Sequence, residues 1–210
     1  FENGSCYVQD ISAQLAAPLI SPKKGERILD ACCAPGGKTT HLAELCPDAE
    51  IIAIDNDKMR LLRVQENIDR LQNKNVKIML GDATRHDWWD KKMFDKILID
   101  APCSGTGVIR RHPDIKLLRK PRDVSEVTKI QALILDNLWA LLKPGGELVY
   151  ATCSVLKDEN ENQINAFLQR SGDAKNEEIS LSWGDGLIGK QQLPEHKYDG
   201  FYYAKIIKSL

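Results

Sequence analysis

The stretch Ile-Leu-Asp-Ala-Cys-Cys-Ala-Pro-Gly-Gly-Lys-Thr-Thr-His, residues 28–41, decides the fold that this sequence predicts. A short apolar run ends at Leu29, which we interpret as the end of a first β-strand. Pro-Gly-Gly at 35–37 then indicates a tight turn, and a helical pattern begins near Lys38. In α/β sheets, a strand, glycine-rich turn and helix place backbone N–H groups and a helix N-terminus beside a ligand. A glycine-rich turn that binds no ligand is the alternative.

Two nucleotide-binding patterns do not fit this turn. A phosphate-binding P-loop needs glycine five residues before Gly37, where this chain has Cys32, and the dinucleotide pattern G-x-G-x-x-G is absent. What remains is Asp-x-x-x-Ala-Pro-Gly-Gly-Lys-Thr at residues 30–39. This pattern resembles the S-adenosylmethionine loop of RNA (cytosine-5) methyltransferases.

Composition limits the class of protein. The 210 residues fit one domain of ordinary size, and the chain begins at Phe1 rather than Met, as a piece of a longer protein would. A net charge of −1 gives the whole chain no nucleic-acid signature, so any basic surface is local. No apolar run approaches the roughly 18 residues of a membrane span.

The cysteine and histidine pattern predicts neither a metal site nor disulfides. None of the six cysteines forms a C-x-x-C pair, and the four histidines do not stand at zinc-site spacings from them. Nothing indicates an oxidising compartment, so we expect reduced thiols and a cytoplasmic protein.

Strand-like and helical patterns alternate along the chain. Strands are expected at 27–30, 51–54, 76–80, 94–99, 147–151, 179–182 and 201–208. Helices are expected within 1–20 and at 38–45, 58–71, 124–142 and 158–169. Such alternation favours a mostly parallel sheet with helices on both faces. We therefore expect an α/β, Rossmann-like methyltransferase fold with a seven-stranded sheet that has one antiparallel strand. Residues 1–22 would be a lead-in strand and helix packed on a catalytic domain at 23–210.

Four acidic residues each follow an expected strand: Asp30, Asp55, Asp82 and Asp100. Ligands of open α/β sheets bind outside the carboxyl ends of the strands. Asp55 lies 18 residues after the second glycine of the turn, close to the spacing of a carboxylate that binds a ribose hydroxyl. Asp82 is placed to accept a hydrogen bond from an exocyclic amine such as adenine N6. An adenosyl cofactor without a phosphate loop favours S-adenosylmethionine.

Two cysteines follow neighbouring expected strands, in Asp100-Ala-Pro-Cys103-Ser and Ala151-Thr-Cys153-Ser. Both segments should emerge on the cofactor side and face one cleft. A thiolate that adds to carbon 6 of cytosine makes carbon 5 nucleophilic enough to attack a sulfonium methyl group, which is covalent catalysis. Free cysteine has a pKa of about 8.5, so such a thiol needs electropositive surroundings. A carboxylic acid near ring nitrogen 3, for which Asp100 is suitably placed, would stabilise the adduct.

The resemblance becomes close in three segments: residues 100–116 (Asp-Ala-Pro-Cys-Ser-Gly-Thr-Gly-Val-Ile-Arg-Arg-His-Pro-Asp-Ile-Lys), 150–156 (Tyr-Ala-Thr-Cys-Ser-Val-Leu) and 199–205 (Asp-Gly-Phe-Tyr-Tyr-Ala-Lys). The chain resembles RNA (cytosine-5) methyltransferases that modify small-subunit (16S) ribosomal RNA, over nearly its whole length. The resemblance implies that Cys153 is the nucleophile and that Cys103 helps to release the product.

The resemblance also implies the cofactor contacts: Cys32, Cys33, Ala34, Pro35, Gly36, Gly37, Lys38, Asp55, Asp82 and Asp100. Family members usually have alanine where this chain has Cys33, and often alanine where it has Gly105. The family's N-terminal helical RNA-binding domain is absent from this sequence, which predicts a catalytic domain alone.

A basic segment follows the first of these cysteines. Residues 110–122 hold six cations opposed by Asp114, which would attract a phosphate backbone. A solvated charged face is the alternative. The candidate RNA contacts are Arg110, Arg111, His112, Lys116 and Arg119. The target cytosine would have to be unpaired or flipped out to reach the thiols.

Three functions remain open on the sequence alone. The first is S-adenosylmethionine-dependent methylation of a cytosine in ribosomal RNA through a Cys153 adduct. The second is a cytosine-5 enzyme that acts on another RNA or on DNA; the DNA enzymes use the Pro-Cys thiol, here Cys103, as nucleophile. The third is a non-catalytic RNA-binding module.

Overall fold

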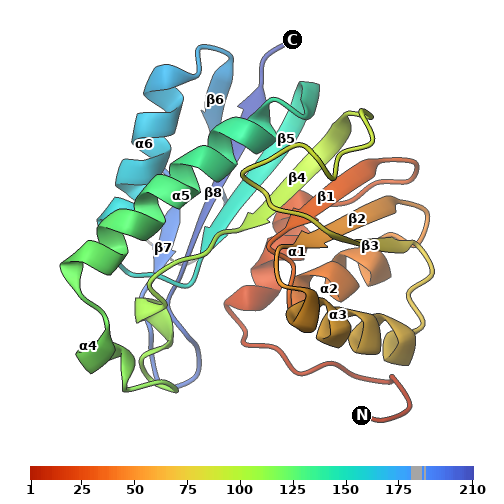
Figure 1. The fold of residues 1–210 in the computed structure, drawn as a ribbon, viewed down its shortest axis with the longest axis horizontal. Coiled ribbons are helices and arrows are strands. Elements are labelled where there is room, and N and C mark those ends of the chain that lie inside the picture. The colour runs from red at the N-terminus through yellow and green to blue at the C-terminus, as the bar shows by residue number, and fades with distance from the viewer. Residues whose placement is uncertain (181–185, 187) are drawn as a thin grey trace.

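A computed structural model describes residues 1–180, 186 and 188–210. Its centre is a single twisted sheet with helices on both faces (Figure 1). The strands are β1 (Arg27–Ala31), β2 (Glu50–Asp55), β3 (Val76–Leu80), β4 (Phe94–Asp100), β5 (Leu142–Thr152), β6 (Ala174–Glu177), β7 (Lys190–Gln192) and β8 (Phe201–Lys208). The helices are α1 (Ala16–Ile20), α2 (Gly37–Leu45), α3 (Lys58–Leu71), α4 (Ile115–Leu118), α5 (Pro121–Trp139) and α6 (Glu161–Arg170).

The sheet has the expected mostly parallel order, β3-β2-β1-β4-β5-β8-β6. β1 lies between β2 and β4, with Leu29 opposite Ile52 on one side and Ile97 on the other. The strand order reverses between β1 and β4. This switch point, at the carboxyl ends of the two strands, is where α/β folds bind ligands. β8 alone runs opposite to the other strands and pairs with β5, β6 and β7. The α/β fold with one antiparallel strand is confirmed.

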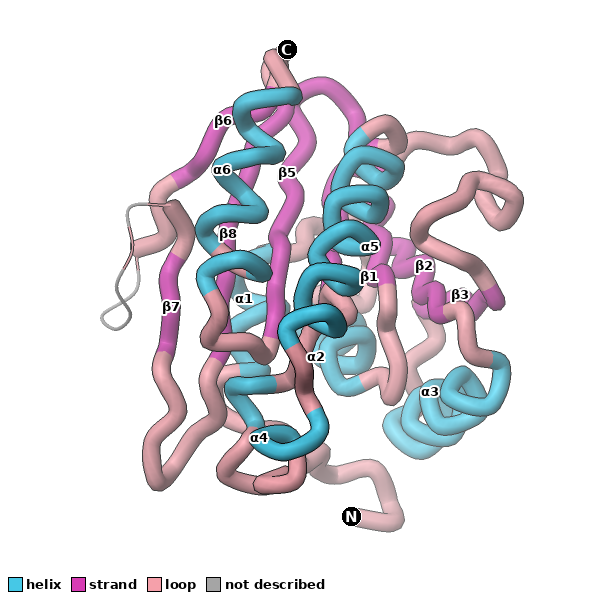
Figure 2. Tube along the Cα trace, turned by 60° about the vertical axis from the view of Figure 1, so that its left-hand side comes forward, coloured by secondary structure: helices cyan, strands magenta, loops and turns pink. Residues whose placement is uncertain are grey.

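The strand count differs from the expected seven. β6 pairs with residues 205–208 of β8 and β7 with residues 201–203, so two short strands share one outer edge (Figure 2). The strand expected at 179–182 was wrong for residues 179–180, which form no strand, and its other two residues lie outside the described part of the chain. β6 begins five residues earlier because a short turn after α6 returns the chain directly to β8. Its sequence, Ala-Lys-Asn-Glu, is an edge strand with little apolar signal.

Alternate residues of the strands pack on opposite faces of the sheet, in two larger hydrophobic clusters and a smaller third one between β2 and α3. On one face, Leu29 and Ile97 pack with Ile134 and Leu138 of α5 and with Phe167 of α6. The other large cluster is lined by Ile28, Leu98 and Val149 of the sheet and by Ile20 and Leu42 of α1 and α2. This alternation follows from the period-2 geometry of strands, and it places α1–α3 on one face and α5–α6 on the other (Figure 1).

Two local features depart from the pattern expected along the chain. Residues 1–12 form no strand, and a short 3-10 turn at Ala13–Leu15 leads into α1, which packs on α2 and β5. α5 begins at Pro121, because proline is compatible with a helix's first turn and Asp123 accepts a hydrogen bond from the Lys120 N–H there. It ends at Trp139 rather than at 142.

Within the described residues, none of the helices combines the length and hydropathy that a bilayer crossing requires. In that same part of the chain, no group of three or more His, Cys, Asp or Glu side chains is arranged to hold a metal ion. All six cysteines are free thiols.

Candidate active site

Two cysteine thiols meet at the carboxyl edge of the sheet. β4 and β5 are adjacent and parallel, with Asp100 opposite Ala151, so the segments that follow them emerge on the same side. The Sγ atoms of Cys103 and Cys153 lie 3.4 Å apart, and both residues are partly exposed. Gly107 donates its N–H to the Cys153 carbonyl oxygen at 2.8 Å, an approach that a Cβ atom would block. The two cysteine-bearing loops are therefore in direct contact.

The surroundings separate the acidities of the two thiols. The hydrogen bond from Cys103 is the main cause that lowers the pKa of Cys153, and the charge of Lys38 lowers it further against burial and Asp100. The same hydrogen bond, burial and the negative charges of Cys153 and Glu159 raise the pKa of Cys103. These opposite directions favour Cys103 as the thiol that keeps its proton. Cys153 is the thiol that ionises first, which is the requirement for a nucleophile.

A pocket of about 290 Å³ opens beside these sulfur atoms. Its wall carries both cysteines and three of the four strand-end carboxylates, those of Asp55, Asp82 and Asp100. Asp55 and Asp100 end β2 and β4, and Asp82 lies two residues after β3; these strands are neighbours of β1 or of one another in the sheet. The pocket wall therefore combines three carboxylates with two thiols.

Asp55 and Asp82 differ in burial and in the hydrogen bonds that their carboxylates already accept. Asp55 is buried, and its carboxylate accepts hydrogen bonds from the Ala34 and Asp57 N–H groups at 3.2 and 3.1 Å. One carboxylate oxygen of Asp82 accepts both the N–H and the hydroxyl of Thr84. Its other oxygen lies 4.0 Å from the Arg85 guanidinium, and the side chain is partly exposed. Within the described residues this second oxygen accepts no hydrogen bond, so it remains available as an acceptor.

Some residues of the glycine-rich turn line the pocket and others do not. Cys32 and Ala34 line it, whereas Cys33 is buried against Val64 and Leu61 of α3. A Cβ on Gly36, whose φ is +102°, would crowd Val64. Burial is the main cause that raises the pKa of both thiols in the turn, so they stay protonated.

The remaining residues of the turn lie beside the pocket rather than on its wall. Pro35 accepts a hydrogen bond from the Asn67 side chain through its carbonyl oxygen. Gly37 opens α2, and a Cβ there would meet the Tyr7 hydroxyl at 2.7 Å. The atoms nearest to a Cβ built on Gly36 or Gly37 thus belong to other parts of this chain.

Lys38 and Asp100 form an ion pair beneath the thiols. The Lys38 Nζ lies 2.7 Å from a carboxylate oxygen of Asp100 and 5.2 Å from the centroid of the Phe201 ring. Burial lowers the pKa of Lys38, but the charge of Asp100 and the hydrogen bond to it outweigh burial, so the net shift is upward. Lys38 is therefore a fixed positive charge that holds Asp100 in the wall of the pocket.

Asp30 is buried away from the pocket, although the sequence groups it with the other strand-end acids. One of its oxygens accepts a hydrogen bond from the Thr39 hydroxyl at 2.5 Å, and the other has no partner in the described part of the chain. Burial is the main cause that raises its pKa to about 7. Asp30 stabilises the start of α2 and is no part of the pocket wall.

We expect Asp30 to make the stability of the fold depend on pH. Between about pH 4 and pH 7 the folded state holds a proton that the unfolded state has released, so the free energy of unfolding falls as the pH rises. The total change is of the order of 4 kcal/mol. Asp30→Asn should flatten this slope in urea unfolding at pH 5 and pH 8. Asp87→Asn, at an exposed position, is the control; an unchanged slope in Asp30→Asn would contradict the prediction.

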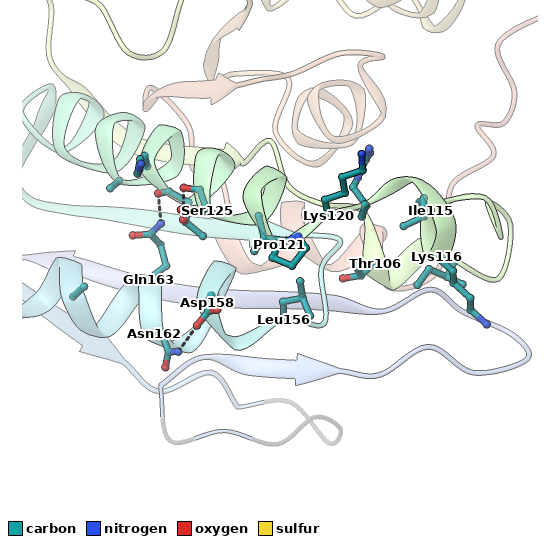
Figure 3. Close-up of a pocket in the computed structure, with 17 residues that line it drawn as sticks. Thr106, Ile115, Lys116, Lys120, Pro121, Ser125, Leu156, Asp158, Asn162 and Gln163 are labelled. Atoms are coloured by element: carbon teal, nitrogen blue, oxygen red, sulfur yellow. Dashed lines mark hydrogen bonds between the residues drawn. The ribbon is translucent and has the colours of Figure 1, made fainter.

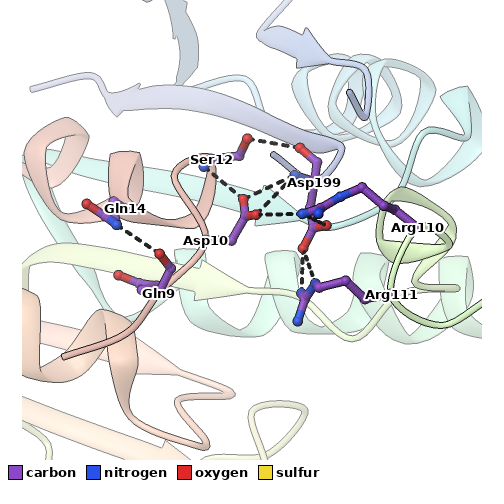
Figure 4. A network of polar contacts seen from close by, with 7 residues as sticks. All are labelled: Gln9, Asp10, Ser12, Gln14, Arg110, Arg111 and Asp199. Atoms are coloured by element: carbon purple, nitrogen blue, oxygen red, sulfur yellow. Dashed lines mark hydrogen bonds and ion pairs between the residues drawn. The ribbon is translucent and has the colours of Figure 1, made fainter. Parts of the chain in front are cut away.

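Two of the candidate RNA contacts, although exposed, bind the buried carboxylate of Asp199 (Figure 4). Asp199 has no exposed surface, and its carboxylate binds Arg110 at 3.1 Å and the Nε of Arg111 at 2.9 Å. Its N–H donates to Asp10, and its carbonyl oxygen accepts from the Ser12 hydroxyl. Arg110 and Arg111 thus connect the Cys103 loop to the start of β8 and to the lead-in.

The other three candidate contacts are exposed, as Arg110 and Arg111 are, but they make no bond to Asp199. Arg119 donates from Nε to the Ser104 carbonyl oxygen at 2.7 Å, next to Cys103. Lys116 and Arg119 line a groove of about 800 Å³ between α4, α5 and the start of α6 (Figure 3). Lys120 and Lys129 also line it, and Asp158 is its acidic residue. His112 is exposed but does not line the groove.

One buried side chain near the thiols has no signal in the sequence pattern used above. Glu159 lies in a 3-10 turn, Lys157–Glu159, between β5 and α6. It accepts hydrogen bonds from Ser104 and Ser154, the residues that directly follow the two cysteines. The shared Cys-Ser pattern is the only sequence feature that points to such a partner.

The chain is similar to known methyltransferases over its whole length. The family model described as 16S rRNA methyltransferase RsmB/F matches residues 17–207. A ribosomal RNA small subunit methyltransferase B from Shewanella oneidensis is 53% identical over 211 residues, which cover 100% of this chain and 49% of that protein. The chain therefore spans about half the length of the curated relatives that it matches.

Two solved structures share both fold and sequence. NSun6 from Pyrococcus horikoshii, solved with SFG, has a TM-score of 0.91 and 36% identity over 100% of this chain and 55% of that chain. A methyltransferase homolog protein from Pyrococcus horikoshii has a TM-score of 0.86 and 34% identity, covering 99% of this chain and 70% of that one. The extent of the family match and the identity to its named relatives leave one conclusion: this chain belongs to the 16S rRNA methyltransferase RsmB/F family.

Proposed function

We propose that this chain methylates carbon 5 of a cytosine in 16S ribosomal RNA, with S-adenosylmethionine as donor, Cys153 as nucleophile and Cys103 as the residue that assists release. The observation that carries the proposal is the pair of thiols 3.4 Å apart on the wall of a pocket that also holds Asp55, Asp82 and Asp100. The donor and both sulfur atoms would then share one space.

The pocket fits the proposed donor in charge and in hydrogen-bonding groups. S-adenosylmethionine supplies an electrophilic methyl group on a positively charged sulfonium, which suits a wall with three carboxylates. Asp55 would accept from the ribose hydroxyls, and the free oxygen of Asp82 from the adenine amine. Cys32 and Ala34 would provide the close backbone contact. The solved NSun6 relative was crystallised with SFG, and we propose that the donor of this chain binds in the pocket described above.

The protein's own groups account for the order of the chemical steps. Lys38 and the hydrogen bond from Cys103 favour the Cys153 thiolate, which would add to carbon 6 of the cytosine. After the methyl group is on carbon 5, a base removes the carbon 5 proton and the Cys153 thiolate leaves. Once Cys153 is bonded to carbon 6, its negative charge no longer raises the pKa of Cys103, so Cys103 would release its own proton to solvent and, as a thiolate, act as this base. The carbon 5 proton then passes to Cys103, the C5–C6 double bond re-forms, and the bond from carbon 6 to Cys153 breaks. This division of roles disfavours the DNA-type alternative, in which Cys103 would be the nucleophile.

The RNA backbone is proposed to follow the groove rather than the whole basic segment. Arg110 and Arg111 are engaged with Asp199, whereas Lys116, Lys120 and Lys129 have no ion-pair partner within the described residues. Thr106 and Leu156, three residues beyond each cysteine, line the same groove, so a strand lying there would pass beside the thiols. Phosphate contact from these lysines would be independent of sequence.

Removing groove lysines should weaken RNA binding in a salt-dependent way. We expect Lys116→Ala and Lys129→Ala each to lower the affinity for a single-stranded RNA several-fold and to reduce the slope of log K against log salt by about 1. Lys24→Ala is the control, because Lys24 is exposed, stands just before the amino end of β1, and does not line the groove. Fluorescence anisotropy at four salt concentrations measures both quantities. Equal affinity and slope in all three variants would contradict the groove assignment.

The test of the proposed function is mass spectrometry of RNA incubated with the chain and isotope-labelled S-adenosylmethionine. We expect the label on carbon 5 of cytosine in 16S rRNA. Label in DNA alone would favour the DNA-type enzyme. RNA binding without S-adenosylmethionine binding in calorimetry would favour a non-catalytic module.

A further inference from the structure

Glu159 is a buried carboxylate whose hydrogen-bond partners are all neutral. It has no exposed surface, and no ion pair joins it to a cation in the described part of the chain. A carboxylate that leaves water is costly unless its oxygens are satisfied. Its oxygens accept from the Ser104 N–H at 2.7 Å, the Ser104 hydroxyl at 2.5 Å, the Ser154 hydroxyl at 2.6 Å and the Gln131 amide at 3.2 Å. Four donors thus converge on one side chain.

Three of these four donors belong to the serines that directly follow the two cysteines. Ser104 directly follows Cys103, and Ser154 directly follows Cys153. The two hydroxyls also lie 3.3 Å from each other. Glu159 therefore joins the loops after β4 and β5 immediately beside the two sulfur atoms.

The backbone around Glu159 is hydrogen-bonded to β5, the strand that precedes Cys153. The Tyr150 hydroxyl of β5 donates to the Glu159 carbonyl oxygen at 2.8 Å. The next residue, Asn160, binds the Thr152 hydroxyl at 2.6 Å and the Ser154 carbonyl oxygen at 2.9 Å. The short turn at 157–159 thus has a fixed position relative to β5. A rotation of Glu159 would break contacts at both ends of this turn.

The charge of Glu159 complements that of Lys38. Lys38 lies on α2, which covers one face of the sheet, and Glu159 precedes α6, which covers the other. The positive charge lowers the pKa of Cys153, and the negative charge contributes to the raised pKa of Cys103. The thiol pair therefore lies in a field that favours the proton on Cys103.

We propose that Glu159 is a positioning residue for the two-thiol centre: it fixes the Cys103 and Cys153 loops to each other through Ser104 and Ser154 and makes Cys153 the thiolate of the pair. This inference rests on the proposed function for its role in catalysis, but its effect on the thiols is independent of RNA. The charged and titratable groups that act on the pair, besides Glu159, are Lys38, Asp100, Arg111, Tyr150 and Tyr203.

The test compares Glu159→Gln and Glu159→Asp with Glu161→Gln as the matched control. Glu161 is two residues away, carries the same charge, and in the described structure its side chain makes no hydrogen bond to either cysteine loop. Each protein is alkylated with iodoacetamide from pH 6 to pH 10, without RNA or donor. Peptide mass spectrometry then gives the ratio of Cys153 to Cys103 labelling. The thermal midpoint is measured in parallel.

We expect the unmodified chain and Glu161→Gln to label Cys153 in preference to Cys103 at neutral pH. Glu159→Gln should reduce that preference about tenfold and move the labelling of Cys103 to lower pH, because a charge has been removed beside it. Glu159→Asp, which retains the charge, should recover most of the preference. In RNA methylation we expect a lower kcat and an unchanged KM for the donor, since the pocket acids are untouched.

A labelling ratio in Glu159→Gln within twofold of the Glu161→Gln ratio would overturn the proposal, whatever the methylation rate. If Glu159→Gln does not fold, Ser154→Ala takes its place, because it removes one of the bonds and leaves the carboxylate. An unchanged ratio in Ser154→Ala would then overturn the proposal. A chain that shows the expected labelling but methylates no RNA would refute the proposed function and leave the positioning role of Glu159 intact.

Discussion

Cys153→Ala is expected to abolish methyl transfer, with a loss of at least about 1,000-fold in kcat. The variant lacks the thiolate that would add to carbon 6, and without that addition carbon 5 of cytosine is a poor nucleophile. Cys103 is not expected to substitute, because burial and the charge of Glu159, both of which the variant retains, still raise its pKa. Transfer of a labelled methyl group to RNA measures the loss.

Cys103→Ala should fail at a later step. Its Cys153 thiolate still forms the adduct, but the proton carrier 3.4 Å away is missing, so a covalent protein–RNA complex should accumulate on denaturing gels. Cys6→Ala, at an exposed cysteine far along the chain from both, is the control and should behave as the unmodified protein. A fully active Cys153→Ala protein would refute the mechanism. Exchange of the two phenotypes would favour Cys103 as nucleophile.

Lys38→Met should have the second-largest effect, because it removes the cation shared by the pocket acid and the nucleophile. Asp100 would lose its ion-pair partner at 2.7 Å, and Cys153 would lose a positive charge that lowers its pKa. We expect the free energy of unfolding to fall by about 3 kcal/mol. We also expect the rate of methyl transfer at pH 7 to fall about 100-fold, with partial recovery at higher pH as the thiol ionises.

The pH profile distinguishes a direct effect on Cys153 from loss of stability alone. A merely destabilised protein keeps the pH dependence of the unmodified one, whereas Lys38→Met should move the acidic limb of the profile to higher pH. Lys58→Met, at an exposed position on α3, is the control. The double variant Lys38→Met with Asp100→Asn should lose less stability than the two single variants combined, because the pair is coupled. An unshifted profile would contradict the assigned role of Lys38.

Local patterns in the sequence were sufficient for most of the fold. The continuous apolar runs at β1, β2 and β4 and the helical spacing in α3 predicted elements that the structure contains, since both patterns depend on a few consecutive residues. The β6 and β7 edge was not predictable in this way. An edge strand such as Lys190–Gln192 buries no apolar face, so it has no pattern, and only its pairing with β8 defines it.

The candidate site likewise has a part that local sequence predicted and a part that it did not. The sequence alone determined that five residues stand at or just after the carboxyl ends of strands: Cys103, Cys153, Asp55, Asp82 and Asp100. Parallel strands end at one edge, so their meeting could be predicted. Only the tertiary structure decided which charged residues form ion pairs or hydrogen bonds with residues distant in the sequence. Arg111 lies 88 residues from Asp199 along the chain, and Glu159 lies 55 residues from Ser104. Such pairs form because burial of a charged group requires a partner, and no local period records which distant residue supplies it.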